Sequence, residues 1–298
     1  MAMARTILGG VFIAILFIGV AYAAVSPVLQ PISFPRLEIP WLDVEGEKVV
    51  DRYTLVKGTN VSGTVKFIDL NVSMKFGGIN MLFSHDPNLA CGVSLERSIN
   101  ASELEAGYVV SDGGRILQVG LYGESGELNV TLGNGYQYNG TFGLRIGGVM
   151  MELGQYANIS KFNVFIKYVG GLDVRINNGA SFEQIDLSVD IGGLQLTVDC
   201  DSLKSDGVIN AGVTIGGFSM SVDVDTSGVG VSLDSTVDMG GLTVNHADFV
   251  GQKSERSCSV KTVGYASATH KLDVKATVGL GGVTLQKSIQ YGFPGFPT

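Results

Sequence analysis

The sequence predicts an all-β protein built from antiparallel hairpins, preceded by one hydrophobic helix at the N-terminus. Three observations predict this fold class. Gly-Gly pairs recur between alternating apolar runs, the runs on either side of each pair mirror one another, and proline is missing from most of the chain. None of the seven prolines lies between Pro87 and Pro294, as expected where main-chain N–H groups are needed for sheet ladders.

The Gly-Gly pairs are interpreted as tight hairpin turns. A two-residue turn that follows the right-handed twist of strands needs positive φ, which glycine adopts without a Cβ clash. From Gly147 to Gly240 the pairs recur at about 24 residues, the length of two strands with their turns, which indicates an internal repeat. The pairs are Gly77-Gly78, Gly147-Gly148, Gly170-Gly171, Gly192-Gly193, Gly216-Gly217, Gly240-Gly241 and Gly281-Gly282.

The register of the apolar runs puts one side of each predicted hairpin on one face. Around Gly192-Gly193, a two-residue turn pairs Val189 with Leu196 and Leu187 with Val198. The opposite face is polar. Because an apolar face must be covered and no long helix is available to cover it, the sheet is expected to form one or more β-sandwiches or a barrel.

The N-terminus places the β body outside the cytoplasm. Residues 7–25 are uncharged and almost all apolar, long enough as a helix to cross about 30 Å of hydrocarbon, and Arg5 supplies the positive end that stays inside. Residues 1–25 are either a removable signal peptide, cleaved after Ala23, or an uncleaved membrane anchor. Processing after Gly10, as in the class III signals of archaeal pilins and archaellins, is a third alternative, although the usual basic residue beside the cleaved glycine is missing.

Three further segments follow this one. Residues 26–45 hold four prolines and are expected to form a stiff, extended spacer. Residues 46–160 are predicted to be an N-glycosylated β domain, and residues 161–298 the hairpin-repeat β domain. The boundary is drawn where the glycosylation acceptors end, since all six Asn-x-Ser/Thr sites precede Lys161: Asn60, Asn71, Asn100, Asn129, Asn139 and Asn158. The alternative is that Asn, Ser and Thr simply populate strand exteriors.

The three cysteines allow one disulfide at most. Cys200 continues the inward row of Leu194, Leu196 and Val198 and is interpreted as a small buried hydrophobe. Cys91 and Cys258 are therefore the predicted bridge.

The aspartates of the repeats are the only cluster of side chains there that suggests a binding site. Asp199 and Asp201, like Asp223 and Asp225, lie two residues apart on the polar side of a predicted strand, about 7 Å from each other. Oxygens from a neighbouring strand or another subunit would be needed to complete a calcium site. The alternative is a solvated acidic surface that keeps the sheet soluble.

The composition and the missing motifs limit the function classes. A net charge of −8 argues against binding nucleic acid through a general phosphate-attracting surface. The chain has no Gly-x-Ser-x-Gly, His-Glu-x-x-His, phosphate loop or dinucleotide fingerprint, so it is predicted not to be an enzyme and to need no cofactor other than the possible calcium.

Two functional classes fit the pattern. The first is an N-glycosylated extracellular structural protein, a subunit of a cell-surface filament, sheath or envelope layer whose copies join one another through strand edges. In this reading its partners are further copies of itself, N-linked glycans, and the membrane if residues 7–25 are not cleaved. The second is a secreted or anchored module that binds a glycan in a sandwich or a lipid in a lipocalin-like barrel.

Overall fold

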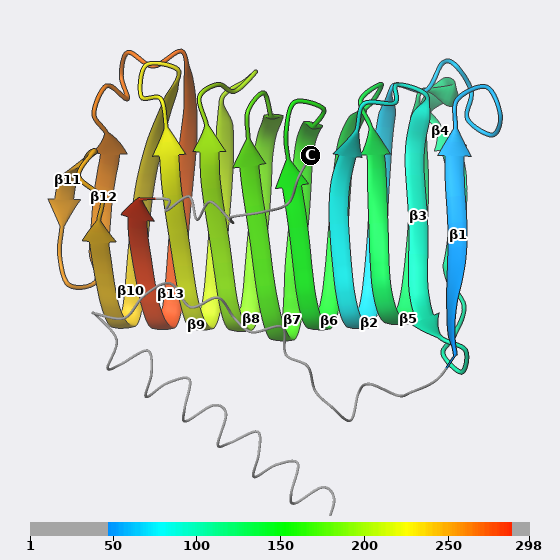
Figure 1. Cartoon of the computed structure of the whole chain (residues 1–298), viewed down its shortest axis with the longest axis horizontal. Coiled ribbons are helices and arrows are strands. Elements are labelled where there is room, and N and C mark those ends of the chain that lie inside the picture. The colour runs from blue at the N-terminus through cyan, green and yellow to red at the C-terminus, as the bar shows by residue number, and fades with distance from the viewer. Residues whose placement is uncertain (1–46, 288–298) are drawn as a thin grey trace, which may run out of the picture.

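The computed structural model describes residues 47–287, so the predicted N-terminal helix, the spacer and the last eleven residues, 288–298, lie outside the described part. Strands make up most of it, as predicted (Figure 1). No helix within residues 47–287 is long and apolar enough to cross a membrane. In chain order the elements are β1 (Lys48–Val56), β2 (Phe67–Ser84), β3 (Leu89–Ser98), β4 (Glu105–Ser111), the 3-10 turn η1 (Asp112–Gly114), β5 (Ile116–Gly133), β6 (Gln137–Leu153), β7 (Asn158–Asn177), β8 (Ser181–Cys200), β9 (Gly207–Val224), β10 (Val229–Asn245), β11 (Phe249–Lys253), β12 (Ser257–Thr262) and β13 (His270–Lys287).

The long strands fold over near their middle. β2, β5 to β10 and β13 each run for 17 to 20 residues, and each has a glycine bend at its centre. The halves before the bends form one layer, called here the first layer, and the halves after them form the second layer (Figure 1). The side of the molecule where the bends lie is called the bend edge.

The predicted antiparallel hairpins are wrong. Both halves of β8 pair with β9 in parallel and in one register, with Val189 opposite Val213, Gly192 opposite Gly216 and Val198 opposite Val222. In a hairpin, the halves of β8 would instead pair with each other. The folded-over arrangement is favoured because the apolar side chains of both halves point between the layers. A hairpin would leave that whole face uncovered.

The predicted positive φ is confirmed at the first glycine of every Gly-Gly pair except Gly170-Gly171. Gly192 has φ +141°, and a Cβ placed on it would lie 1.8 Å from the carbonyl oxygen of Gly170 in the next strand. The second position has room, since a Cβ on Gly148 would meet nothing nearer than 3.8 Å. In sheet order the first glycines form a stacked row, called here the glycine row: Gly126, Gly77, Gly147, Gly170, Gly192, Gly216, Gly281 and Gly240.

One continuous sheet contains all the strands. Its order is β1-β3-β5-β2-β6-β7-β8-β9-β13-β10-β12-β11, with β4 beside β5. Three strands lie out of chain order: β2 is inserted between β5 and β6, β13 between β9 and β10, and β12 between β10 and β11. The predicted domain boundary at residue 160 falls inside β7, which pairs with β6 from Ile159 to Ile176. The sheet therefore continues without a break across this predicted boundary.

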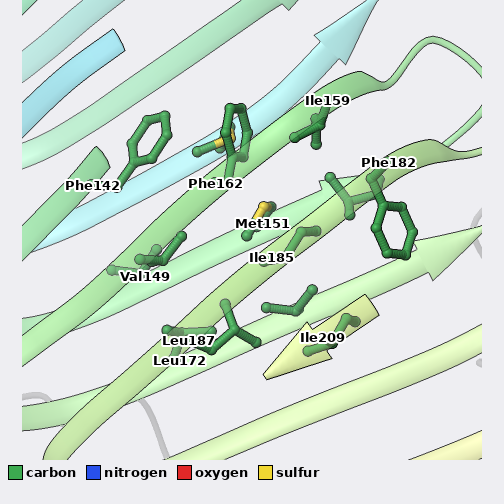
Figure 2. Close-up of a cluster of buried hydrophobic side chains, with 14 of the residues drawn as sticks. Phe142, Val149, Met151, Ile159, Phe162, Leu172, Phe182, Ile185, Leu187 and Ile209 are labelled. Carbon is green, nitrogen blue, oxygen red and sulfur yellow. The ribbon is translucent and has the colours of Figure 1, made fainter. Parts of the chain in front are cut away.

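The core lies between the layers. The predicted inward row of β8 is buried on both sides of its bend, from Ile185 to Val189 and from Leu194 to Val198. Figure 2 shows Phe142 and Phe162 from the first layer above Val149 and Met151 from the second. The two phenyl rings meet edge to face with centroids 5.1 Å apart. The sheet order has two ends, so the folded sheet resembles the predicted sandwich more than the predicted barrel.

Candidate functional site

The two ends of the sheet are stepped, and they are the candidate assembly surfaces. At the N-terminal end, the first half of β5 is covered by β4, whereas its second half is covered by β3 and then β1. At the C-terminal end, the first half of β10 is covered by β12 and then β11, whereas its second half pairs with β13 and has no other neighbour within residues 47–287. The second layer therefore projects at one end and the first layer at the other. These are called here the N-terminal step and the C-terminal step.

Apart from Glu105 at the start of β4, the recessed edges carry no charged side chain. The run from Met239 to Asn245 in β10 has no charged residue, and neither does the run from Ala106 to Ser111 in β4. Tyr108 and Val109 of β4 are exposed, as is Met239. Charged side chains on an edge strand hinder pairing with another chain, so both runs are open templates for a further strand. Both projecting edges do carry charge, on Lys48, Asp51 and Arg52 in β1 and on Lys253 in β11.

A buried ion pair holds the N-terminal step together. The Arg97 side chain in β3 is only 6% exposed, and its Nε donates a hydrogen bond of 2.7 Å to Asp51 Oδ2 in β1. Its Nη1 donates to the carbonyl oxygen of Ala101, and the Leu104 N–H donates to Asp51 Oδ2. The hydrogen bond from Arg97 is the main cause of the lowered pKa of Asp51. The pair thus fastens β1, β3 and the loop that leads to β4.

Two of the four predicted calcium ligands lie side by side. Asp199 in β8 is directly opposite Asp223 in β9, as the prediction of a contribution from a neighbouring strand requires. Asp201 and Asp225 each lie one residue beyond the paired strand ends, and Asp225 Oδ1 accepts hydrogen bonds from the N–H and hydroxyl of Ser227. Within residues 47–287, no group of three or more His, Cys, Asp or Glu side chains is arranged to hold a metal ion. Calcium binding stays a prediction that depends on ligands from another copy.

The predicted Cys91–Cys258 disulfide is wrong. Cys91, Cys200 and Cys258 are all free and buried. Cys91 lies in β3 and Cys258 in β12, near opposite ends of the sheet order, so the sheet itself keeps them apart. Cys200 faces the core with 2% exposure, which confirms the interpretation as a buried hydrophobe.

The native protein is expected to be inert to thiol reagents. Burial raises the pKa of both Cys91 and Cys200 to about 12, and a thiol rather than a thiolate is a poor nucleophile. Titration with a chromogenic disulfide at pH 8 should detect no reactive cysteine before denaturation and all three afterwards, without a reductant. A single reactive thiol in the denatured protein would instead support the bridge.

The predicted glycosylation acceptors lie on several surfaces of the N-terminal half. Asn71 and Asn139 are on the outer face of the first layer, in β2 and β6, and Asn129 is on the second half of β5. Asn60, Asn100 and Asn158 are exposed. The Asn139 amide donates to Asp69 in the neighbouring strand. Glycosylation itself stays a prediction.

A shallow hollow of about 750 Å³ lies between β11, β12 and the loop before β13. Tyr265 lines it, with Lys261 Nζ 4.6 Å and Lys271 Nζ 5.9 Å from the ring centroid. The Tyr265 hydroxyl donates to Asp273, and burial together with that carboxylate raises the pKa of Tyr265 to about 12. Asp206 accepts from the Lys271 N–H. The residues that line the hollow include these two lysines and no carboxylate, so Asp273 and Asp206 contact Tyr265 and Lys271 from outside the lining.

Sequence reasoning missed the bend in β5 and both recessed edges. Gly126 belongs to the glycine row with φ +137°, but Glu127 stands in place of the second glycine, so the pair is not visible. The signal that could have found it is Leu128-Asn-Val130-Thr-Leu132. Apolar residues at every second position also follow each of the other bends. The edges depend on strand order, for which the chain carries no local signal.

Comparisons with known proteins identify the fold. No protein-family model and no curated protein sequence matches the chain. A candidate cell adhesion protein from Clostridium sporogenes has a similar structure, with a TM-score of 0.52 and 12% identity over 81% of this chain and 100% of its own. Candidate adhesins from Parabacteroides distasonis and Bacteroides fragilis cover 81% and 80% of this chain and 98% and 97% of their own, at 12% and 14% identity, but their TM-scores of 0.28 carry no argument. What these comparisons establish is that the folded-over sheet is shared with the clostridial protein.

Proposed function

We propose that the protein is a non-enzymatic structural subunit of the cell surface, joined end to end with further copies through its strand edges. The observation that carries this proposal is the complementarity of the two steps. At one end the second layer has β3 and β1 beyond β5, one strand more than the first layer with β4, and at the other end the first layer has β12 and β11 beyond β10, where the second layer has no further strand. When two copies approach end to end, the projecting layer of each enters the recess of its neighbour, which brings β1 alongside the second half of β10 or β11 alongside β4 in a lap joint.

Strand directions allow either contact of this joint. Lys48 is opposite Ser98, near the bend edge, so β1 runs away from that edge, as does the second half of β10. These two strands would pair in parallel. β11 runs toward the bend edge, whereas β4 runs away from it, so this second pair would be antiparallel. Each contact would extend an existing ladder by main-chain hydrogen bonds.

Three other features support a place at the cell surface. The uncharged segment 7–25 suits export or anchoring, and the six glycosylation acceptors suit an extracellular surface. The clostridial protein with the same fold is described as a candidate cell adhesion protein. The heterologous joint has no built-in closure, so it generates an open filament or sheath rather than a dimer.

The joint is tested by placing a charge on its recessed edge. Thr243 in β10 points outward between Leu242 and Val244, both of which pack against the core. We expect the wild type to form oligomers that grow with concentration, and Thr243→Arg to remain monomeric because an edge charge opposes strand pairing. Sedimentation velocity and negative-stain microscopy of the full chain in detergent would measure this.

Thr284→Arg is the matched control for that variant. Thr284 lies opposite Thr243 on the same outer face, but in β13, one strand inside the edge. It should assemble like the wild type, and all three proteins should melt at the same temperature. A wild type that stays monomeric at high concentration with calcium present, or a Thr243→Arg variant that assembles normally, would contradict the joint and favour the glycan- or lipid-binding alternative.

A further inference from the structure

A row of apolar side chains follows the bend edge on the outside of the glycine row. The residue immediately before each glycine bend is apolar in every long strand except β5, which has Ser125 there. Strand pairing places each of these residues directly opposite the next. In sheet order this corner row is Phe76, Ile146, Val169, Ile191, Ile215, Leu280 and Met239.

The corner row is exposed along its length. Phe76 is 47% exposed, Ile146 39%, Leu280 36% and Met239 63%, and the other members are partly exposed. Six inter-strand steps of about 4.8 Å give it a length of about 29 Å. Scattered apolar residues on a protein surface need no explanation, but a contiguous line of this length marks an interaction surface.

The chain enters the described body at this same edge. Glu96 is opposite Glu127, which directly follows the bend glycine Gly126, and two residues further along β3 Ser98 is opposite Lys48, the first residue of β1. Residues 1–46 therefore join the body beside the bends. They include the uncharged apolar segment 7–25, so the part of the sequence predicted to enter a membrane joins the body at the bend edge, three strands before the corner row begins at Phe76.

We propose that the bend edge rests on a lipid bilayer, with the corner row inserted into the interfacial region. The charged residues that precede the corner row have both signs: Lys75 and Arg145 toward one end, Asp190 and Asp238 toward the other. The attraction is therefore hydrophobic and does not require anionic lipid. The strands then stand upright on the membrane, the outer faces of the two layers face sideways, and the loops at the opposite edge point away from it. This orientation is independent of the end-to-end joint, because it applies to a single copy.

The proposal is tested by lipid quenching of tryptophan fluorescence. The full chain with Trp41→Phe would be reconstituted into phosphatidylcholine vesicles that contain a brominated phosphatidylcholine, with one new tryptophan at Ile146→Trp. Asn134→Trp is the control, since Asn134 is an exposed turn residue between β5 and β6 at the opposite edge. We expect quenching at Ile146→Trp to exceed that at Asn134→Trp at least threefold, and to be unchanged by anionic lipid or by salt.

A second position guards against local disruption of the fold. Met239→Trp, at the most exposed corner residue, should be quenched as strongly as Ile146→Trp, and both variants should melt like the Trp41→Phe parent. Equal quenching at the corner row and at Asn134→Trp would overturn the proposal, as would a chain that does not float with the vesicles. Weak quenching together with an intermolecular disulfide in Ile146→Cys would instead assign the corner row to contact with a second copy.

Discussion

The Gly147→Ala variant is expected to melt well below the wild type, whereas Gly148→Ala should melt close to it. Gly147 has φ +139°, a conformation that costs a residue with a Cβ about 1–3 kcal/mol. Its new Cβ would also lie 1.8 Å from the carbonyl oxygen of Gly77, a clash with main chain that no rotamer relieves. If the strain and the clash together lower the free energy of unfolding by about 3 kcal/mol, the midpoint of thermal unfolding should fall by about 6–12 °C in a protein of this size.

The neighbouring glycine is the control within the same bend. A Cβ on Gly148 meets nothing nearer than 3.8 Å, and β5 already carries Glu127 at the equivalent position. Thermal melts followed by circular dichroism would compare the two variants with the wild type. Equal stability of Gly147→Ala and Gly148→Ala would show that the glycine row is not closely stacked.

The Arg97→Met variant should unfold at a lower urea concentration than the wild type, because loss of the guanidinium leaves the partly buried Asp51 carboxylate without its main hydrogen-bond donor. Asp51 would lose both hydrogen bonds from the guanidinium, and the carbonyl of Ala101 would lose its donor. Urea denaturation measures the decrease in stability, and limited proteolysis should show earlier cleavage between Ser98 and Leu104. Arg115→Met is the control, since Arg115 and Asp112 form an exposed pair. Its effect should stay within about 0.5 kcal/mol, and an equal loss in both variants would contradict the role of burial.

The same ion pair predicts a pH dependence. Because the pKa of Asp51 is lowered in the folded state, its contribution to stability is fully present above the usual value of 3.8 and is lost as the pH falls through the lowered value. The stability difference between the wild type and Arg97→Met should therefore be constant from pH 7 to about pH 5 and shrink below 3.8. A difference that grows on acidification would have the wrong sign for this mechanism.

The inward rows and the conformation of the bends were predictable, but the direction of pairing was not. Alternation around Gly192 puts Val189 and Leu196 on one face whether the halves pair as a hairpin or fold over into two layers. Local pattern alone does not separate these cases. The unused signal was the near-identity of successive copies: repeats of about 24 residues that place glycine on glycine and apolar on apolar are also what a parallel ladder needs.

The candidate assembly surfaces were less predictable than the core. Edge strands were expected to join copies, but the strands that become edges are set by the order of the whole sheet. The sequence predicted the last repeat, Lys271 to Tyr291, as the segment that joins copies, whereas the structure places β13 between β9 and β10 and leaves the second half of β10 at the rim. The cysteine bridge failed for a related reason, since counting cysteines gives no position for Cys91 and Cys258 in a sheet.

The inserted position of β13 has a consequence for how the chain reaches its native state. Gly216 and Gly240 are 24 residues apart, the same spacing that separates Gly192 from Gly216, so β10 is matched in register to stack directly on β9. That pairing is local, fast to form and non-native. During synthesis the competing partner, His270–Lys287, emerges only after β10, β11 and β12, and it must then enter between two strands whose bends already fit each other. We therefore expect the slow phase of refolding to be the step in which β13 replaces β10 as the neighbour of β9. Truncated chains that end before His270 should form a stable sheet in which β10 pairs directly with β9.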